Sequence, residues 1–576
     1  MANIIKKRGQ KLVKQISRIS QKAGEESKER IKENLVERLP HVKNVRLLII
    51  EWSLLVMAII MLAITQALWY AESYSNTTFV SGGTYIEATL GKINSLNPLF
   101  ASTSSEKALS RLMFSTLSTT DYSGHIGPGL AETIIADKTG KVWTIKLRDN
   151  LKWSDGEPLT NADVLFTISL IQNSKVNSNY SSNLANVKVA EQEDGTITFT
   201  LPAVYVSFAT ALNIPILPEH ILKDATPELL LEHSFSSAPV TSGAFAYNAT
   251  QAVGTSGEKI IYLTRNNHYY KGAPMLDSFA IHAFISADDI VSAFKNASIT
   301  ATAELSDLDK DRVSSSLIYE KQTAINNGVY LFFNTTNGAF KTKSLRKAVQ
   351  RGLDLGKIRE LVGDERHIDY PILSSQIALK NYASLPDYDP SAAMDTVTAA
   401  KLTEPIRLVT VSTGYMPKLA EQIKEQLGYI GMDVNVETYE PSQDFVMNVI
   451  STRSYDILLY EIELGPDPDL LAYYHSSQAT NSGLNLSNYH NALADDHILA
   501  ARSSMDANLR TAKYESFIKQ WVEDAPAVGL YQVNMTYYFN KNVRSFSENN
   551  HLVSATDRFV DVEDWAAKKD ERNRTP

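Results

Sequence analysis

The sequence predicts an α/β fold with more than one domain, preceded by a single membrane-spanning helix. The chain has 576 residues, which is too long for one hydrophobic core and suggests two or three domains. Strand-like and helix-like segments alternate in its second half, a pattern that favours an α/β lobe. A long apolar run near the N-terminus follows a segment rich in basic residues.

The apolar run covers residues 47–70 and is long enough to cross a bilayer core of about 30 Å as a helix. Its one charged residue, Glu51, lies about one turn from the start, where the side chain can reach the interface. Trp69 and Tyr70 form an aromatic belt at the other end. We therefore expect an uncleaved, single-pass anchor. The alternative is a cleaved signal peptide, because small residues follow the run.

Charge is distributed unevenly along the chain. Residues 1–46 contain thirteen Lys and Arg against five Glu, although the whole chain has a formal net charge of −9. This asymmetry predicts a cytoplasmic basic tail and a body outside the cell membrane, extracellular or periplasmic. The acidic body gives no reason to expect nucleic-acid binding. Cysteine is absent from the sequence, which excludes disulfides, cysteine-ligated metals and a thiol nucleophile.

The most characteristic stretch is residues 147–164, with the sequence LRDNLKWSDGEPLTNADV. It follows a strand whose side chains alternate between two faces. The Ser-Asp-Gly turn comes next, and Gly156 is free to adopt a positive φ there. Thr160 is then positioned to cap a helix that begins near Asn161.

This order of strand, turn and helix start resembles the signature of the peptide/nickel-type extracellular solute-binding proteins, which serve ABC importers. The alternative is a generic hairpin-to-helix junction. The resemblance spans roughly residues 82–546. Other segments match the same family in the same order, among them Asn97-Pro98-Leu99, Pro128 to Glu132, Pro239 to Phe245, Arg265 to Tyr270 and Arg346-Lys347-Ala348. The resemblance implies a two-lobed, periplasmic-binding-protein-like fold of the large type II class, which closes about a hinge on a solute.

We expect the exterior part to be organised around those two lobes. Residues 71–82 are rich in Ser, Thr and Gly and form a tether to the membrane. The first lobe covers residues 83–277, and the second covers residues 278–524. Residues 525–576 return to the first lobe and end in a C-terminal tail.

The candidate ligand-binding segment is a strand from Tyr455 that runs into a Gly-Pro turn. In peptide-binding relatives this strand pairs with an extended peptide, and an Asp in the turn meets the peptide amine. Leu464 stands at that position here. Glu461 or Glu463 is the candidate replacement; a solvated strand face is the alternative. We predict ligand contacts along the strand and its turn, from Tyr460, Glu461, Ile462, Glu463 and Asp467.

Three further residues are predicted to bind the ligand. Asn485 and Tyr489 match an N-x-x-x-Y step of the family, in loops that suit a polar cleft. Trp153 is the candidate from the first lobe, where it would stack on the ligand; the alternative is a buried Trp beside the turn.

The predicted function is capture of peptides, or similar extended polar solutes, and delivery to an ABC permease. We expect a monomer with no cofactor, no metal and no catalytic residue. One rival is a type II membrane glycosyltransferase, since Asp467-Pro468-Asp469 has the D-x-D form that can hold Mn²⁺. The other is a ligand sensor outside transport, for which the 46 residues before the anchor contain no recognisable output domain.

Overall fold

A computed structural model of the chain describes residues 50–66, 75–121, 123–315, 317–363, 367–547 and 551–573. The chain divides into two compact units. One comprises Met1–Thr78 with Asp570–Pro576, and the other comprises Phe79–Lys569.

The first unit contains an apolar helix at residues 50–66 whose side chains are exposed, with Leu62 67% exposed. Strand β1 (Ser75–Val80) pairs with β18 (Lys568–Asn573). Within the described ranges, no helix combines the length and apolar character needed to span a membrane. The predicted anchor at residues 47–70 extends past this helix at both ends into residues outside the described ranges. The basic tail and the first part of the tether also lie outside them.

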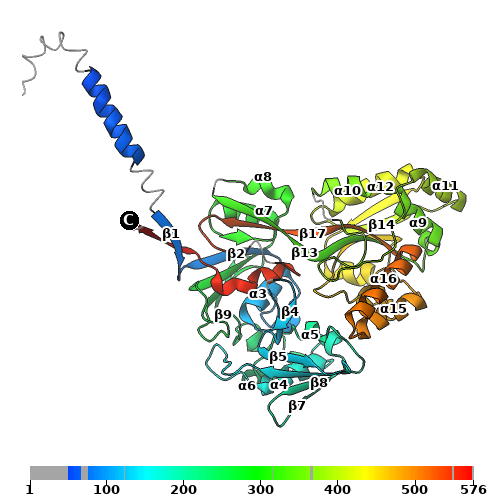
Figure 1. The fold of residues 1–576 in the computed structure, drawn as a ribbon, viewed down its shortest axis with the longest axis horizontal. Coiled ribbons are helices and arrows are strands. Elements are labelled where there is room, and N and C mark those ends of the chain that lie inside the picture. The colour runs from blue at the N-terminus through cyan, green and yellow to red at the C-terminus, as the bar shows by residue number, and fades with distance from the viewer. Residues whose placement is uncertain are drawn as a thin grey trace, which may run out of the picture. The chain divides into compact units, whose positions relative to one another are not determined.

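The second unit is built on one ten-stranded sheet that continues through both lobes (Figure 1). The order of its strands is β15 (Val434–Tyr439), β14 (Ile406–Val411), β16 (Ile457–Glu463), β13 (Ile318–Phe333), β17 (Ala527–Asn540), β12 (Ala301–Thr302), β2 (Thr84–Leu90), β11 (Ser278–Phe284), β10 (Glu258–Arg265) and β9 (Phe245–Val253).

Smaller sheets complete the first lobe: β5 (Ala131–Ala136), β6 (Val142–Leu147), β8 (Ile197–Thr200) and β7 (Lys188–Glu191) form one, and β3 (Ser118–Thr120) pairs with β4 (Ile126–Pro128). The helices of this lobe are α3 (Ser104–Met113), α4 (Asn161–Gln172), α5 (Phe208–Ala211), α6 (Glu219–Leu222), α7 (Ala287–Lys295) and α8 (Lys310–Val313). Those of the second lobe are α9 (Lys343–Gly352), α10 (Leu355–Leu361), α11 (Pro390–Ala400), α12 (Met416–Tyr429), α13 (Gln443–Phe445), α14 (Leu471–Tyr474), α15 (Ala492–Ser503) and α16 (Ala507–Asp524).

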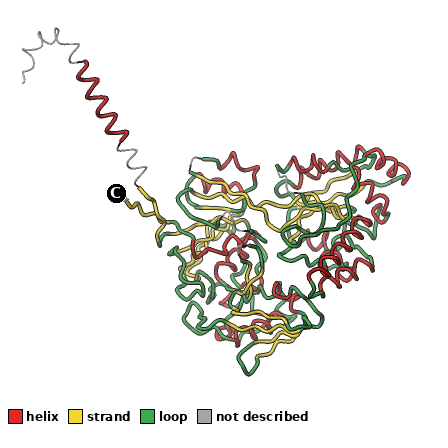
Figure 2. Tube along the Cα trace, viewed as in Figure 1, coloured by secondary structure: helices red, strands yellow, loops and turns green. Residues whose placement is uncertain are grey.

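Strands β13 and β17 connect the two lobes. They pair antiparallel along most of their length, and Figure 2 shows them passing from one lobe to the other. Their register shifts between Ala324 and Gly328. Ile325 is buried in the core of the first lobe, whereas Val329 is buried in the core of the second. The irregularity therefore coincides with the passage between the two cores, where a hinge is expected.

The second lobe begins later than the predicted boundary at residue 278. Strand β11, which starts there, pairs with β2 and β10, and Phe279 and Ile281 are buried in the core of the first lobe. The chain crosses to the second lobe only in β13. An apolar strand has the same sequence pattern in either lobe, so the pattern at residue 278 does not identify the lobe. Strand β17, which returns the chain to the first lobe, begins at Ala527.

The characteristic stretch at residues 147–164 is a structural junction of the first lobe. Gly156 has a φ of 95°, as the turn requires. The Thr160 amide donates to Asp163 Oδ2 at 2.8 Å, and the other oxygen of Asp163 accepts from the Glu219 amide at 2.8 Å. Asp163 therefore caps α4 and also ties that helix to α6.

A buried ion pair joins the N-terminal and C-terminal parts of the first lobe. Glu87 of β2 is fully buried, and its Oε1 accepts from Arg558 Nε at 2.9 Å. Arg558 lies in the 3-10 helix Ala555–Asp564 and is 3% exposed. The other oxygen of Glu87 accepts from the Tyr537 hydroxyl at 2.7 Å. Each buried charge depends on the other, because neither has access to water.

We expect Arg558→Leu to lower the free energy of unfolding by about 3–5 kcal/mol, since it leaves the Glu87 carboxylate buried without a cation. Chemical unfolding of the full chain, followed by tryptophan fluorescence, measures this. The double variant Glu87→Gln with Arg558→Leu should recover most of the loss, because a neutral amide still accepts from Tyr537. An equal loss in the single and double variants would contradict the assignment.

Candidate functional site

A cavity of about 490 Å³ lies between the two lobes, beside the strands that connect them. Its volume is typical of small-ligand sites. The first lobe contributes Ser104, Glu304 and Ala555, among others. The connecting strands contribute Ile325 and Asn534, and the second lobe contributes Thr413, Tyr415, Met416 and Glu461. A ligand in this cavity would therefore contact both lobes.

Strand β16 leaves part of one edge without a strand partner. It pairs with β13 over its whole length, but with β14 only at Ile457 and Leu458. The Leu459 carbonyl accepts from the Thr410 hydroxyl on the β14 side, at 2.9 Å. Main-chain groups of alternate residues point to the same side of a strand, so those of Glu461 also face the β14 side. Within the described residues, no strand pairs with Glu461 there.

The Glu461 side chain lines the cavity beside this open edge. Its Oε1 accepts from Asn327 Nδ2 at 2.7 Å. Burial raises the pKa of the Glu461 carboxyl; nearby Glu463 raises it further, and the hydrogen bond from Asn327 opposes the rise. Among the described residues, the carboxyl forms no ion pair.

Glu304 is a second carboxyl in the same cavity, contributed by the first lobe. It follows β12, and its amide donates to Thr302 Oγ1 at 3.1 Å. Burial raises the pKa of Glu304 to about 7, and the charge of Glu87 adds to the rise. Arg558, the Leu90 amide and the Ser104 side chain partly oppose it. Sequence reasoning missed Glu304, because a single Glu after a two-residue strand has no local pattern that marks a site.

Two predicted residues lie at contacts between the lobes. Glu463 is exposed and forms an ion pair with Lys107 of α3, at 3.7 Å between Nζ and Oε1. Asp467 forms an ion pair with Arg510 of α16, and Arg510 also donates to Ser207 of the first lobe at 3.0 Å. Asp467 therefore holds an arginine that contacts the first lobe, and it does not appear among the residues that line the cavity.

The neighbouring acid of the D-x-D step is paired in the same way. Asp469 Oδ2 accepts from Arg502 Nε at 3.1 Å, and the Arg502 guanidinium lies 4.0 Å from the Tyr205 ring centroid. Both carboxylates that a metal-dependent glycosyltransferase would offer to Mn²⁺ are thus held by arginines.

Tyr460 and Ile462 project to the opposite face of β16 from Glu461. Ile462 is 5% exposed and belongs to the core of the second lobe. Tyr460 is partly buried and packs against Phe445, with 6.3 Å between ring centroids. Neither lines the cavity. Leu464 is also buried, and its carbonyl accepts from Gln376 Nε2 at 2.8 Å.

Asn485 and Tyr489 stabilise a loop inside the second lobe. Asn485 is fully buried and its Nδ2 donates to the Tyr489 carbonyl at 2.9 Å. The Tyr489 hydroxyl donates to Asp524 at 2.7 Å. The structure thus gives both residues structural partners, and neither is among the described residues that line the cavity.

Trp153 is fully buried in the core of the first lobe. Its ring packs against His220, with 6.3 Å between ring centroids. The prediction that it stacks on a ligand is therefore wrong for this structure, because no face of the ring is accessible. The alternative, a buried Trp beside the turn, describes what the structure shows.

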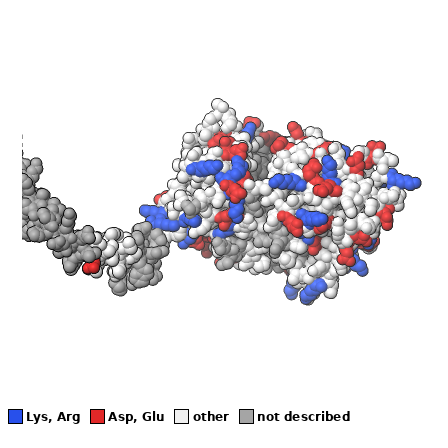
Figure 3. All heavy atoms as spheres, turned by 90° about the horizontal axis from the view of Figure 1, so that it is seen from above, with Lys and Arg blue, Asp and Glu red and all other residues white. Residues whose placement is uncertain are grey.

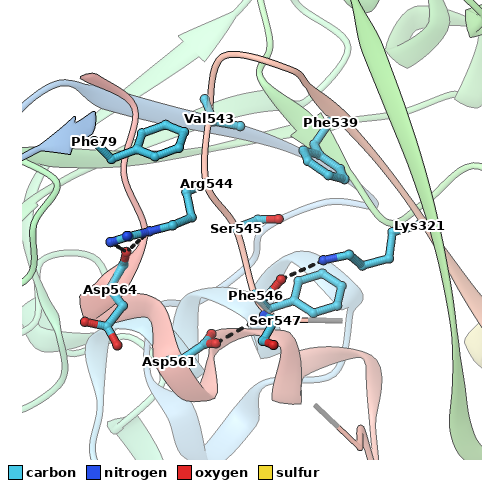
Figure 4. A pocket seen from close by; sticks show the side chains of 10 residues that line it. All are labelled: Phe79, Lys321, Phe539, Val543, Arg544, Ser545, Phe546, Ser547, Asp561 and Asp564. Carbon is cyan, nitrogen blue, oxygen red and sulfur yellow. Dashed lines mark hydrogen bonds between the residues drawn. The ribbon is translucent and has the colours of Figure 1, made fainter. Parts of the chain in front are cut away.

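A second cavity, of about 660 Å³, lies in the first lobe near the end of β1 (Figure 4). Both of its basic side chains already have partners within the protein. Lys321 Nζ donates to the Phe546 carbonyl at 2.6 Å and lies 4.3 Å from the Phe546 ring centroid. The Arg544 guanidinium donates to the Asp564 carbonyl. Because Lys321 and Arg544 are already hydrogen-bonded within the protein, this cavity is a weaker candidate for the solute site than the cavity between the lobes.

Acidic and basic side chains are interspersed on the face shown in Figure 3, where neither sign forms a continuous area. That distribution does not resemble the basic surface of a nucleic-acid-binding protein.

Curated relatives and solved structures resemble this chain over most of its length. The oligopeptide-binding protein AppA of Bacillus subtilis is 25% identical over 489 residues, which cover 81% of this chain and 89% of that protein. The structure of AppA from Bacillus subtilis in complex with a nonapeptide superposes with a TM-score of 0.72 at 23% identity, covering 85% of this chain and all of the other. NikZ from Campylobacter jejuni in complex with Ni(L-His) gives the same TM-score at 23% identity, covering 84% of this chain and 99% of the other.

These structural similarities establish the two-lobed fold of periplasmic binding proteins. Residues 125–483, more than half of the chain, match the family described as bacterial extracellular solute-binding proteins, family 5 Middle. The chain therefore belongs to the family 5 bacterial extracellular solute-binding proteins.

Proposed function

We propose that this protein is a membrane-anchored receptor that captures peptides between its two lobes and delivers them to an ABC permease. The observation that carries the proposal is the open edge of β16 at Glu461, which lies beside the cavity between the lobes. An extended peptide can pair with such an edge through its backbone, largely independently of its side chains. Membership of a solute-binding family, and the oligopeptide-binding names of relatives, support the same reading.

In this proposal Glu461 has two roles. Its main chain pairs with the peptide, and its carboxylate accepts the peptide's free amine. The carboxyl group takes over the role that the family resemblance assigns to an Asp at the position of Leu464. A buried carboxylate whose only described hydrogen-bond donor is a neutral amide gains strongly from a cationic partner.

Closure and release follow from the position of the cavity. A ligand that contacts both lobes stabilises the closed state relative to the open state. Docking to the permease then reverses closure and releases the peptide. The basic segment at residues 1–46 and the apolar segment at residues 47–70 would keep the receptor beside the permease, with its lobes outside the cell membrane.

Native mass spectrometry of the full chain, purified in detergent from a bacterial host, tests peptide capture directly. We expect a series of bound masses that tandem fragmentation identifies as peptides. A protein that carries no peptide as purified, and that binds none from an added peptide digest, would refute the proposal.

We expect Glu461→Gln to weaken binding of the most abundant co-purified peptide by about 10- to 100-fold, the range for loss of one charged hydrogen-bond partner. Isothermal titration calorimetry measures the affinity, and Glu404→Gln, at an exposed position of the second lobe, is the matched control. N-acetylation of the peptide should weaken binding to the native protein but have little further effect on Glu461→Gln. A variant that still discriminates between the free and acetylated peptides would contradict amine recognition by Glu461.

We expect the full chain to remain in the membrane fraction after an alkaline carbonate wash. Protease added to intact spheroplasts should digest the lobes, because they lie outside the membrane. Mass spectrometry of the purified chain should give the mass of the uncleaved protein. A shorter protein in the soluble fraction would instead indicate the cleaved signal peptide.

A further inference from the structure

We infer that the preferred ligand is a peptide with two positive charges, a free amine bound by Glu461 and a basic side chain bound by Glu304. The inference rests on the proposed function and adds the chemical class of the peptide. It makes Glu304 a residue that determines specificity, located on the opposite lobe from the strand that pairs with the peptide backbone.

The charge of the cavity is the first argument. Glu304 and Glu461 are the only charged side chains among the described residues that line it. The remaining lining residues are apolar or carry neutral polar groups, such as Ser104, Thr413 and Asn534. Two carboxylates in a partly enclosed cavity are costly to desolvate unless cations accompany them. A dicationic ligand would supply both.

The surroundings of Glu304 are the second argument. The charged groups that face it are Glu87 of β2 and Arg558 of the 3-10 helix Ala555–Asp564. Arg558 already forms an ion pair with Glu87, with a hydrogen bond of 2.9 Å between Nε and Oε1. When Glu304 is ionised, the three charges therefore sum to −1, and the uncompensated charge belongs to the carboxyl that lines the cavity.

The ionisation of Glu304 agrees with this reading. Burial and the charge of Glu87 raise its pKa to about 7, so the empty cavity disfavours its carboxylate form. A bound cation favours the carboxylate and lowers that pKa again. Affinity for a basic peptide should consequently rise as the pH increases from 5.5 to 7.5, as Glu304 loses its proton.

The positions of the Glu304 and Glu461 carboxyls also affect the closure of the two lobes. Glu461 lies in the second lobe and Glu304 in the first. A ligand with one cation for each lobe gains its second ion pair only when the lobes are together. Such a ligand therefore favours the closed state more than a peptide with a single charge does.

Selection from a random tripeptide library, with free amines and every position randomised, tests the inference on the full chain in detergent. Mass spectrometry compares the retained peptides with the input at pH 7.5. We expect strong enrichment of Lys and Arg. Retained peptides without that enrichment would overturn the inference and leave the proposed function intact. Retention of no peptide would overturn both.

The variant Glu304→Gln isolates the proposed carboxylate, and Glu232→Gln, at an exposed position of the first lobe, is the matched control. Glu304→Gln should weaken binding of the most enriched basic tripeptide about 10- to 100-fold at pH 7.5 and flatten its pH dependence. Binding of a tripeptide in which Ala replaces the basic residue should change little. Equal losses for the two peptides would overturn the assignment, because a general packing defect weakens both.

Thermal unfolding provides a readout that needs no ligand. Because the folded-state pKa of Glu304 exceeds the unfolded value, the unfolded chain ionises first and stability falls as pH rises through the interval from about 4.5 to 7. Gln cannot ionise, so Glu304→Gln should raise the Tm by a few degrees at pH 8 and leave it nearly unchanged at pH 4.5. A Tm difference that is the same at both pH values would contradict an uncompensated carboxylate at this position.

Discussion

The antiparallel pairing of β13 with β17 is the interaction on which both lobes depend. Both strands belong to the one sheet that continues through both lobes, so the same two strands support two separate cores. The chain enters the second lobe through β13 and leaves it through β17. The cavity between the lobes is consequently bordered by Ile325 of one strand and Asn534 of the other. A cavity beside the strands that connect two lobes changes shape when the lobes close, and no other element has to move.

Close packing limits which residues these strands can contain. A Cβ at Gly529 would lie 2.3 Å from the Ile368 carbonyl oxygen, and one at Gly328 would lie 2.6 Å from Ile368 Cδ1. β17 thus needs glycine at position 529, where the Ile368 backbone lies against it, whereas a side chain at position 328 would displace the Ile368 side chain and the Tyr330 ring. The shift in register at the same place leaves Asn326 outside the ladder, where its Nδ2 donates to the Gly465 carbonyl at 2.8 Å. The hinge is in this way tied to the turn that follows β16.

Much of the fold could be predicted from the sequence, but most of the site could not. The strands before residue 147 and after Tyr455 were predictable, because alternating or continuous apolar residues are a local property. The helix start at Asn161, with Thr160 as its cap, was also predictable, because a capping residue is a local signal. Trp153 and Asn485 show where prediction of the site fails. A residue that matches a family motif can have a structural role as easily as a ligand contact, and both of these residues are buried. Glu304 was missed because its importance arises from Glu87 and Arg558, which are distant in sequence.

The structure offers a physical reason why Leu464 stands where the family resemblance places an Asp. The turn that would present an acid to the ligand instead uses Asp467 and Asp469 to hold Arg510 and Arg502, and these arginines contact the first lobe at Ser207 and Tyr205. Because Asp467 and Asp469 are paired with these arginines, they are unavailable to a ligand. Glu461 lies on the strand before the turn, with its main chain on the open edge and its carboxyl in the cavity. In the proposed function, the acid therefore stands on the strand instead of the turn, so that one residue would serve both backbone pairing and amine capture, while the acids of the turn hold arginines that contact the first lobe.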